Sequence, residues 1–273
     1  MRGTQGERLS PLIWLNLVCL DAPLVALAWQ QLFARSFALH VSIAASLALF
    51  ATAWLTYLID RVADARTVAS NMPVSRRQRF ARSHPMFFGC AIAIAATTGA
   101  IAIKSLDPQT LASGARVGAL LIVYLAINRF FTKLWRVLPV KELAIGVLFA
   151  AGVCASLGRV SAVPLPMAST FATLCALNCV SIAFWERDLD LAQQRSSLAT
   201  ALPSLQPAAA LGCVVVAFLA FAYSRQVVAV CIAVSAALLA ILNWRHLNAT
   251  SDARTALADL VLLTPLAALP FAS

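Results

Sequence analysis

Nine long runs of apolar residues follow one another along the chain, separated by short polar segments. They cover residues 11–33, 38–58, 86–103, 111–131, 140–161, 165–185, 207–223, 226–243 and 255–272. A run of about 20 apolar residues crosses a bilayer as an α-helix. The pattern predicts an all-α, polytopic membrane protein with nine transmembrane helices, in which residues 1–273 form a single domain. The first run lacks a small-residue cleavage site, so we expect a span rather than a removable signal peptide.

The composition supports this interpretation. Hydrophobic residues make up 61% of the chain and charged residues only 12%, with a mean hydropathy of +0.84. Soluble globular proteins carry about 25% charged residues, so a soluble protein is excluded. The seven cysteines lie in or beside apolar runs without the paired spacing of a metal site, and we interpret them as packing residues.

The distribution of positive charge predicts the orientation of the chain. The net charge is +10, but if the loops are assigned alternately to two sides, 16 of the 21 Lys and Arg residues fall on one side. Lys and Arg gather on the cytoplasmic side of membrane proteins. We therefore expect a cytoplasmic N-terminus and an external C-terminus, in the cell inner membrane. Nucleic acid is not an expected partner, and no obligate protein partner is indicated.

Acidic residues are scarce and concentrated. Five of the 11 lie in two similar segments, `DRVAD` at 60–64 and `ERDLD` at 186–190. Each segment follows a predicted span that ends in aromatic residues, and four spans separate them, so both segments return to the same face. This weak internal repeat is typical of membrane proteins with a central site. The five residues are Asp60, Asp64, Glu186, Asp188 and Asp190.

The spacing of these acids has a chemical consequence. Residues four apart on a helix lie on one face, with Cβ atoms about 5–6 Å apart, and like charges repel strongly in a low dielectric. A positive group is therefore expected between them. Arg61 and Arg187 point about 100° away along the helix and are better placed to contact a substrate. Mg²⁺ prefers oxygen ligands and shares substrate phosphates.

We therefore predict that the four carboxylates of Asp60, Asp64, Glu186 and Asp190, with Asp188 beside them, hold Mg²⁺ and a diphosphate at the mouth of the bundle. Solvated helix ends are the alternative for these residues.

Three polar residues fall inside predicted spans, where ionisable side chains usually face the bundle interior. Asp21 is expected to line the central cavity. Asn178 either reaches that cavity or forms an interhelical hydrogen bond. Asp259 is expected to cap its helix or to pair with Arg254.

These residues together resemble the UbiA-type intramembrane prenyltransferase superfamily, whose members have nine helices and two aspartate-rich motifs after the second and sixth helices. The first family motif, Asn-x3-Asp-x3-Asp, is similar to Thr56-x3-Asp60-x3-Asp64. The second, Asp-x3-Asp, is similar to Glu186-x3-Asp190. The segments `LDAPL` at 20–24, `VYLAINRFF` at 123–131 and `VKELAIGVLFAAG` at 140–152 resemble family segments in the first, fourth and fifth helices.

The chain departs from the family at several positions. Thr56 replaces an Asn, Glu186 replaces an Asp, and Met72-Pro73-Val74 lacks the arginine of a family Arg-Pro-Leu step. A family Lys downstream of Tyr124 is Asn128 here, followed by Arg129 and then Lys133. These four residues are candidates for contact with phosphate or acceptor. The arginine-rich segment 76–82 either supplies replacement phosphate ligands or touches lipid headgroups.

The resemblance implies a Mg²⁺-dependent transfer of a prenyl group from a polyprenyl diphosphate to an aromatic or other small lipophilic acceptor. It also implies a central cavity open to the cytoplasmic side, with membrane lipid around the bundle. Two alternatives remain open from the sequence. One is a terpene cyclase of the same type, and the other is a non-catalytic or transport protein that retains the fold.

Overall fold

The computed structural model describes residues 11–69, 71–131, 140–158, 163–222, 226–244 and 251–272. Within these ranges all regular elements are helical and no strand occurs. The longer helices are α2 (Asp21–Ser36), α3 (Ile43–Thr67), α5 (Pro85–Lys104), α6 (Pro108–Phe130), α8 (Lys141–Ala155), α9 (Leu165–Trp185), α12 (Gln206–Phe221), α13 (Val227–Trp244) and α14 (Ser251–Val261). The shorter ones are α1 (Pro11–Leu17), α4 (Arg76–Ser83), α10 (Arg187–Ala192), α11 (Leu198–Ala201), α15 (Pro265–Ala268), and the 3₁₀ turns Pro203–Leu205 and Leu269–Phe271.

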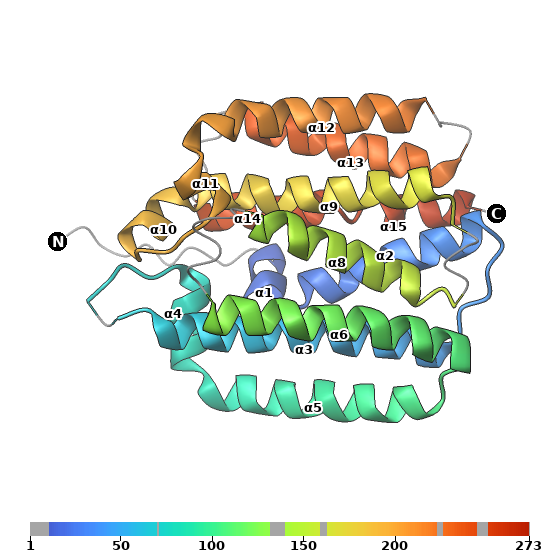
Figure 1. Ribbon diagram of the computed structural model, residues 1–273, viewed down its shortest axis with the longest axis horizontal. Helices are drawn as coiled ribbons and strands as arrows, with labels where there is room; N and C mark the ends of the chain where they lie inside the picture. Colours follow the sequence, from blue (N-terminus) through green and yellow to red (C-terminus); the bar gives the residue numbers. More distant parts are fainter. Residues whose placement is uncertain are drawn as a thin grey trace.

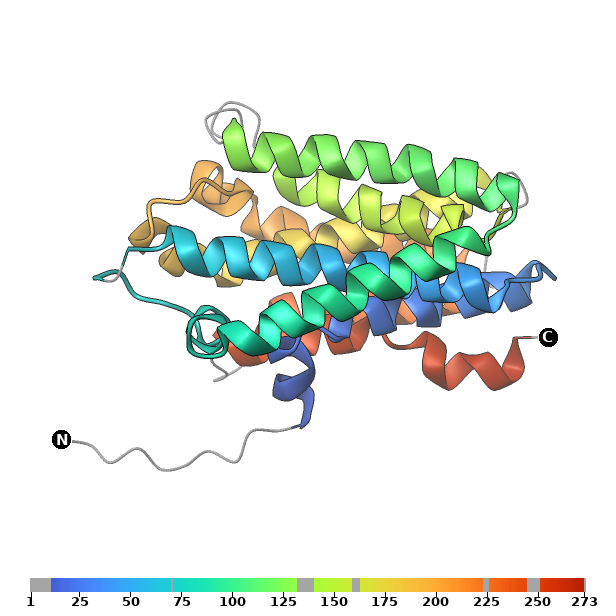
Figure 2. The ribbon, with the colours of Figure 1, turned by 90° about the horizontal axis from the view of Figure 1, so that it is seen from below.

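The long helices lie side by side along one axis (Figures 1 and 2). In Figure 1, α12 and α13 form one edge of the bundle and α5 forms the other, with α9, α8, α2, α6 and α3 between them. The short helices α4, α10 and α11 gather at one end, at the left of Figure 1. That end also holds the C-terminal turns of α3 and α9, so it carries both acidic segments.

Seven helices among the described residues are long and apolar enough to cross a membrane. They are Ile43–Thr67, Pro85–Lys104, Pro108–Phe130, Leu165–Trp185, Pro203–Phe221, Val227–Trp244 and Ser251–Phe271. The protein is therefore an integral membrane protein, as the sequence predicted. The two other predicted spans, 11–33 and 140–161, correspond to shorter helices. The first is divided between α1 and α2, and α8 has only 15 residues.

The first and last predicted spans are not continuous helices, which corrects the sequence prediction. The first is interrupted at residues 18–20, where Cys19 has a φ of 60°. The last is interrupted at residues 262–264, just before Pro265, which cannot donate a helical hydrogen bond. Each break frees backbone carbonyls inside an apolar bundle, where an unpaired polar group is costly.

Side chains from neighbouring helices bind these freed carbonyls. Trp54 Nε1 donates to Val18 O at 3.1 Å. At the second break, Trp29 Nε1 donates to Leu262 O at 2.8 Å and Ser235 Oγ donates to Val261 O at 3.0 Å. The interruptions are therefore fixed by tertiary hydrogen bonds.

An aromatic cluster forms the centre of the main core. Trp29, Phe33 and Phe171 are all fully buried. The ring centroids of Trp29 and Phe171 lie 4.5 Å apart, and those of Phe33 and Phe171 lie 5.4 Å apart. Aromatic pairs at such distances add stability beyond their buried area. The cluster fastens α2 to α9, and the indole nitrogen of Trp29 extends this attachment to the break after α14.

Helices α8 and α9 approach each other most closely at Gly146. A Cβ atom added to Gly146 would overlap the backbone of Ala176 in α9. Only glycine therefore allows this approach, as small residues do at many membrane helix interfaces. The contact matters for the site because α8 begins, and α9 ends, beside the acidic segments.

We expect Gly146→Ala to lower the free energy of unfolding by about 1–3 kcal/mol, because the added methyl group must push α8 and α9 apart. Gly89→Ala in α5 is the matched control, since an added Cβ there meets no atom within 4 Å. That change should be neutral or stabilise by up to about 1 kcal/mol. Unfolding in detergent, followed by circular dichroism, measures both. Equal stability of the two variants would contradict the close approach.

Candidate functional site

The two acidic segments lie at the same end of the bundle, but their local structures differ. Asp60 and Asp64 occupy the last turns of α3, which continues to Thr67. The second segment is not part of one continuous helix. Helix α9 ends at Trp185, Glu186 is its C-cap residue, and α10 begins at Arg187. Asp190 N still donates to Glu186 O at 2.9 Å, so one turn separates the two acids.

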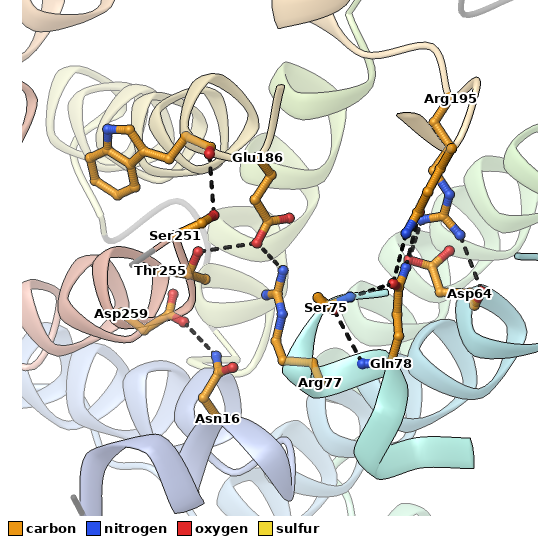
Figure 3. A network of polar contacts seen from close by, with 12 residues as sticks. Asn16, Asp64, Ser75, Arg77, Gln78, Glu186, Arg195, Ser251, Thr255 and Asp259 are labelled. Atoms are coloured by element: carbon orange, nitrogen blue, oxygen red, sulfur yellow. Dashed lines mark hydrogen bonds and ion pairs between the residues drawn. The ribbon is translucent and has the colours of Figure 1, made fainter. Parts of the chain in front are cut away.

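Arg195 joins the two acidic segments. Its Nη1 lies 2.8 Å from Asp64 Oδ2, and its Nη2 donates to the carbonyl of Asp64 at 3.2 Å (Figure 3). Its own backbone N donates to Asp190 O at 2.8 Å. A guanidinium has five donors in a fixed planar arrangement, so one side chain can bind several oxygens. A positive group was expected between the acidic residues, and at Asp64 that group is the guanidinium of Arg195.

Glu186 is bound by a second arginine. Arg77, in α4, forms a short ion pair with Glu186 Oε1 (Figure 3). Thr255 Oγ1 in α14 donates to the same oxygen at 3.2 Å. Both partners are largely buried, with side-chain exposures of 13% for Arg77 and 16% for Glu186. One residue of the arginine-rich segment 76–82 thus contacts the second acidic segment.

Helix α4 is held against the second acidic segment by a set of glutamine contacts. Ser75 and Gln78 form a capping box at its N-terminus, which satisfies backbone donors that the first turn leaves free. Gln78 and Gln193 are both buried, and Gln193 Nε2 donates to Gln78 Oε1 at 2.9 Å. Gln193 Nε2 also donates to Pro73 O at 2.8 Å. These bonds fix the position from which Arg77 reaches Glu186.

The remaining two carboxylates, of Asp60 and Asp190, form no ion pair with an arginine among the described residues. Asp60 interacts electrostatically with Arg61 first and then with Lys141, at the start of α8, and Arg195. Asp190 interacts with Lys141 and Arg195. Burial raises the pKa of Asp190 to about 6, although a hydrogen bond from Ser197 and the charge of Lys141 act in the opposite direction. Asp190 therefore titrates near neutral pH.

Tyr124 in α6 belongs to the same region. Asp60, Glu142 and Asp64 are among its electrostatic neighbours. Glu142 is buried, and its Oε1 accepts a hydrogen bond from Leu198 N at 3.2 Å, at the start of α11. Lys141, the first residue of α8, lies near both acidic segments, because it is an electrostatic neighbour of Asp60 and of Asp190.

An apolar cavity of about 490 Å³ extends between α3, α6 and α8. Its few polar lining residues include Thr56 and Tyr57 at one end and Thr110 and Ser156 towards the other. Thr56 precedes Asp60 by one helical turn, and its hydroxyl donates to Thr52 O at 2.8 Å. The cavity therefore begins one turn from the first acidic segment and runs away from it between apolar side chains.

The other predicted site residues have varied positions. Asn128 is half-buried at the end of α6, whereas Arg129 is exposed and its guanidinium lies 5.9 Å from the ring centroid of Phe130. Asp188 is exposed on α10. Arg187 has a buried Nε without a hydrogen-bond partner among the described residues. Lys133 lies outside the described residues.

Arg61 points away from the carboxylates beside it, as the helical spacing predicted. Its electrostatic neighbours include Cys19 and Asp21 at the first helix break, in addition to Asp60. Its Nε is buried and has no hydrogen-bond partner among the described residues. Arg61 therefore faces the interior of the bundle.

Asp21, Asn178 and Asp259 are brought together inside the bundle. Asn16 Nδ2 donates to Asp21 Oδ2 and, at 3.3 Å, to Asp259 Oδ2. Asn178 Nδ2 lies 3.4 Å from Asp259 Oδ1. Asp259 therefore binds two amides of other helices and is not simply a helix cap. Asn178 makes the interhelical contact that was one of its two sequence interpretations.

The described residues contain no group of three or more His, Cys, Asp or Glu side chains placed to hold a metal ion. A ring of four protein carboxylates around Mg²⁺ is thus not the arrangement in this part of the chain. Mg²⁺ commonly takes only one or two carboxylates and completes its shell with water and substrate phosphates. Asp60 and Asp190 fit that mode, since arginines bind Asp64 and Glu186 instead.

Sequence reasoning missed the roles of Arg77, Lys141, Arg195 and Thr255. Arg195 had a local signal, because it follows the second acidic segment by a few residues. Arg77 lay in a segment for which two interpretations were open. Thr255 had no signal, because only the tertiary fold brings α14 to the end of α9.

We expect Arg77→Gln to destabilise the protein by about 3 kcal/mol, because it leaves the Glu186 carboxylate buried without its partner. Arg79→Gln is the matched control, since Arg79 lies exposed on the same helix and should change stability by less than about 0.5 kcal/mol. The double variant Arg77→Gln/Glu186→Gln should recover most of the loss. Chemical denaturation in detergent measures all three. Equal effects of the two single arginine variants would contradict the ion pair.

Comparison of the chain with protein-family models, with curated proteins and with solved structures finds no match in any of the three. The resemblance to the UbiA-type superfamily accordingly depends on the motifs quoted above and on their order along the chain. Function must be argued from the geometry at the acidic end of the bundle.

Proposed function

We propose that the protein is an intramembrane prenyltransferase of the UbiA type. It would transfer a prenyl group from a polyprenyl diphosphate to an aromatic or other small lipophilic acceptor, with Mg²⁺ as cofactor. The observation that carries this proposal is the position of the cavity. A space of about 490 Å³ with mostly apolar walls begins at Thr56, one helical turn from Asp60 in the first acidic segment. A prenyl diphosphate has this same division into a long apolar tail and a charged head.

The helix arrangement supports the proposal. Counting the first predicted span as α1 with α2, and adding α8 to the seven candidate spans, gives nine helical units. The two acidic segments follow the second and sixth of these units, as in the superfamily. In the proposed orientation, the end that carries α4, α10 and α11 faces the cytoplasm, because Lys and Arg are concentrated in its loops.

The diphosphate would bind where the basic side chains surround the acidic segments. Lys141 and Arg195 lie near Asp60 and Asp190, and Arg77 lies at Glu186. Arginine binds phosphate oxygens in a bidentate manner. In the proposal these residues replace the family cations that are missing at Met72 and Asn128.

Bound Mg²⁺ would supply neutralisation of the negative charge that develops on the departing diphosphate. Asp60 and Asp190 are the carboxylates proposed to hold it. Lys141 and Arg195 would orient the diphosphate and stabilise the same charge electrostatically. The allylic C–O bond breaks with its electron pair leaving on the diphosphate oxygen. The apolar walls of the cavity would keep water from the allylic cation until the acceptor attacks and loses its proton.

A second candidate is a transport function, and one observation favours it. The first and last helices are both interrupted, and interrupted helices commonly form the substrate or ion sites of membrane transporters. A transport protein would bind its substrate without breaking a covalent bond. Release of pyrophosphate therefore distinguishes the two candidates.

We expect the protein, purified in detergent or nanodiscs, to bind a labelled polyprenyl diphosphate only in the presence of Mg²⁺. Asp60→Asn and Asp190→Asn should each weaken binding at least about tenfold, because each removes one carboxylate from the cation site. Asp107→Ser is the control, since Asp107 caps α6 at the opposite end of the bundle and serine preserves a cap. Undiminished Mg²⁺-dependent binding in both site variants would refute the assignment.

Incubation of the same preparation with membrane extract, as a source of acceptors, distinguishes the three candidate functions. A transferase releases pyrophosphate and forms a prenylated acceptor. A terpene cyclase releases pyrophosphate and forms a product without any acceptor. Binding without release would favour the transport candidate.

Mg²⁺-dependent binding should also depend on pH through Asp190. Its pKa of about 6 means that the carboxylate is roughly 90% ionised at pH 7 and roughly 10% ionised at pH 5. Because only the ionised form holds a cation, binding should weaken about tenfold over this interval, and it should recover when the pH is raised again. Titration of binding by scintillation proximity measures the midpoint.

Ser197→Gly provides the control for this assignment. The hydrogen bond from Ser197 lowers the pKa of Asp190, so its loss should move the midpoint to higher pH. Glycine retains most of the capping at the start of α11. A midpoint that stays in place in this variant, or binding that is constant from pH 5 to 7, would contradict the role of Asp190.

A further inference from the structure

The two interrupted helices meet at a pair of buried carboxylates. Asp21 is the first residue of α2, directly after the break at residues 18–20, and only 7% of it is exposed. Asp259 lies three residues before the break at residues 262–264. α14 packs against both α1 and α2. Ionisable side chains inside a membrane bundle are costly and usually functional.

Amides and one backbone N–H donate to this pair of carboxyl groups. The side-chain amide of Asn16 donates to both carboxylates, and Figure 3 shows its contact with Asp259. Ala22 N donates to Asp21 Oδ1 at 2.9 Å. The amide of Asn178 lies 3.4 Å from Asp259 Oδ1. Since one nitrogen touches both carboxyl groups, the two groups are close, and two negative charges there would repel each other in a low dielectric.

A small cavity lies directly beside Asp259. Its volume is about 30 Å³, and Asp259, Asn178, Tyr57 and Cys179 are its polar lining residues. Asn178 is only 5% exposed, and its Oδ1 has no hydrogen-bond partner among the described residues. An amide oxygen can only accept, and an unmet buried acceptor is costly. The cavity is therefore lined by a carboxylate and by an unpaired amide oxygen, and it has room for one small ion or water molecule.

The positive side chains near this pair have other partners. Arg77, in α4, interacts electrostatically with Asp259 but forms its ion pair with Glu186. Arg61, in α3, lies near Asp21 and shares its charge with Cys19 and Asp60. Neither arginine lines the cavity. The cavity thus has oxygen ligands on its wall and no basic side chain.

We propose that this cavity binds a monovalent metal cation, a sodium ion, with Asp259 and Asn178 Oδ1 as ligands and Asp21 as an additional negative charge. Mg²⁺ would not fit as well, because it retains several of its water molecules and the space admits about one. A dehydrated sodium ion is smaller than a water molecule, so a space that admits one water molecule also admits the ion. Transporters hold sodium in the same type of place, at breaks in membrane helices.

The bound ion would fasten the first and last helices to α9 at the level of both breaks. The small cavity shares Tyr57, Ile145 and Phe149 with the large one, but the proposed ligands Asp259 and Asn178 line only the small cavity and belong to neither acidic segment. The proposal is therefore independent of the proposed prenyl transfer. It predicts that sodium stabilises the folded protein even without any isoprenoid.

The test compares the thermal unfolding of the purified protein in sodium chloride with that in choline chloride of equal ionic strength. A ligand at ~100 times its Kd stabilises the folded state measurably, which for a chain of this size corresponds to a rise in Tm of about 5 °C. Asp259→Asn and Asn178→Ala should each abolish the difference between the two salts. Asp252→Asn, in the first turn of the same helix α14, should retain it.

Two results would overturn the proposal. An equal Tm of the unaltered protein in both salts would show that a proton or a water molecule satisfies the carboxylates. A sodium effect that persists in both Asp259→Asn and Asn178→Ala would place the ion elsewhere. If Asp259→Asn does not fold, Asn178→Ala decides alone, because it leaves both carboxylates in place.

Discussion

A polar group inside this apolar bundle must find a partner within the chain, because neither lipid nor a low-dielectric interior can supply one. This constraint governs both the helix breaks and the acidic end of the bundle. The carbonyls freed at the two helix breaks are bound by Trp54, Trp29 and Ser235. At the mouth, the carboxylates of Asp64 and Glu186 are bound by Arg195 and Arg77. Each exception to helical regularity is matched by a side chain from a distant part of the sequence.

The same constraint gives the four motif carboxylates different roles. Two of them are neutralised by arginines and hold together α3, α4 and the segment after α9. The other two, of Asp60 and Asp190, lie near positive charge but are free of arginine ion pairs among the described residues. A site for a charged substrate needs both kinds of residue. The ion-paired carboxylates hold the helices in place, and the carboxylates without an ion pair remain available to bind a cation. The proposed diphosphate site and the proposed sodium site differ in this respect, since the latter has oxygen ligands and no basic residue on its wall.

Much of this arrangement could be predicted from the sequence. The features that could not be predicted depend on tertiary contacts. Periodic apolar runs predicted the membrane helices, and the even number of spans between the two acidic segments predicted their common end. The break at residues 18–20 had only one sequence signal, Pro23 a few residues downstream, because Val18, Cys19 and Leu20 themselves are apolar. It depends on a hydrogen bond from Trp54, 36 residues away. The turn at Glu186 and the pairing of Arg77 likewise depend on tertiary contacts, and the binding of Mg²⁺ stays a prediction.

The bond between the Trp29 indole and the Leu262 carbonyl has a mechanical consequence. It couples the beginning of the chain to its end through a side chain that is wholly enclosed. Separation of α2 from the segment after α14 would break this bond and leave a buried indole N–H without a partner, which is costly.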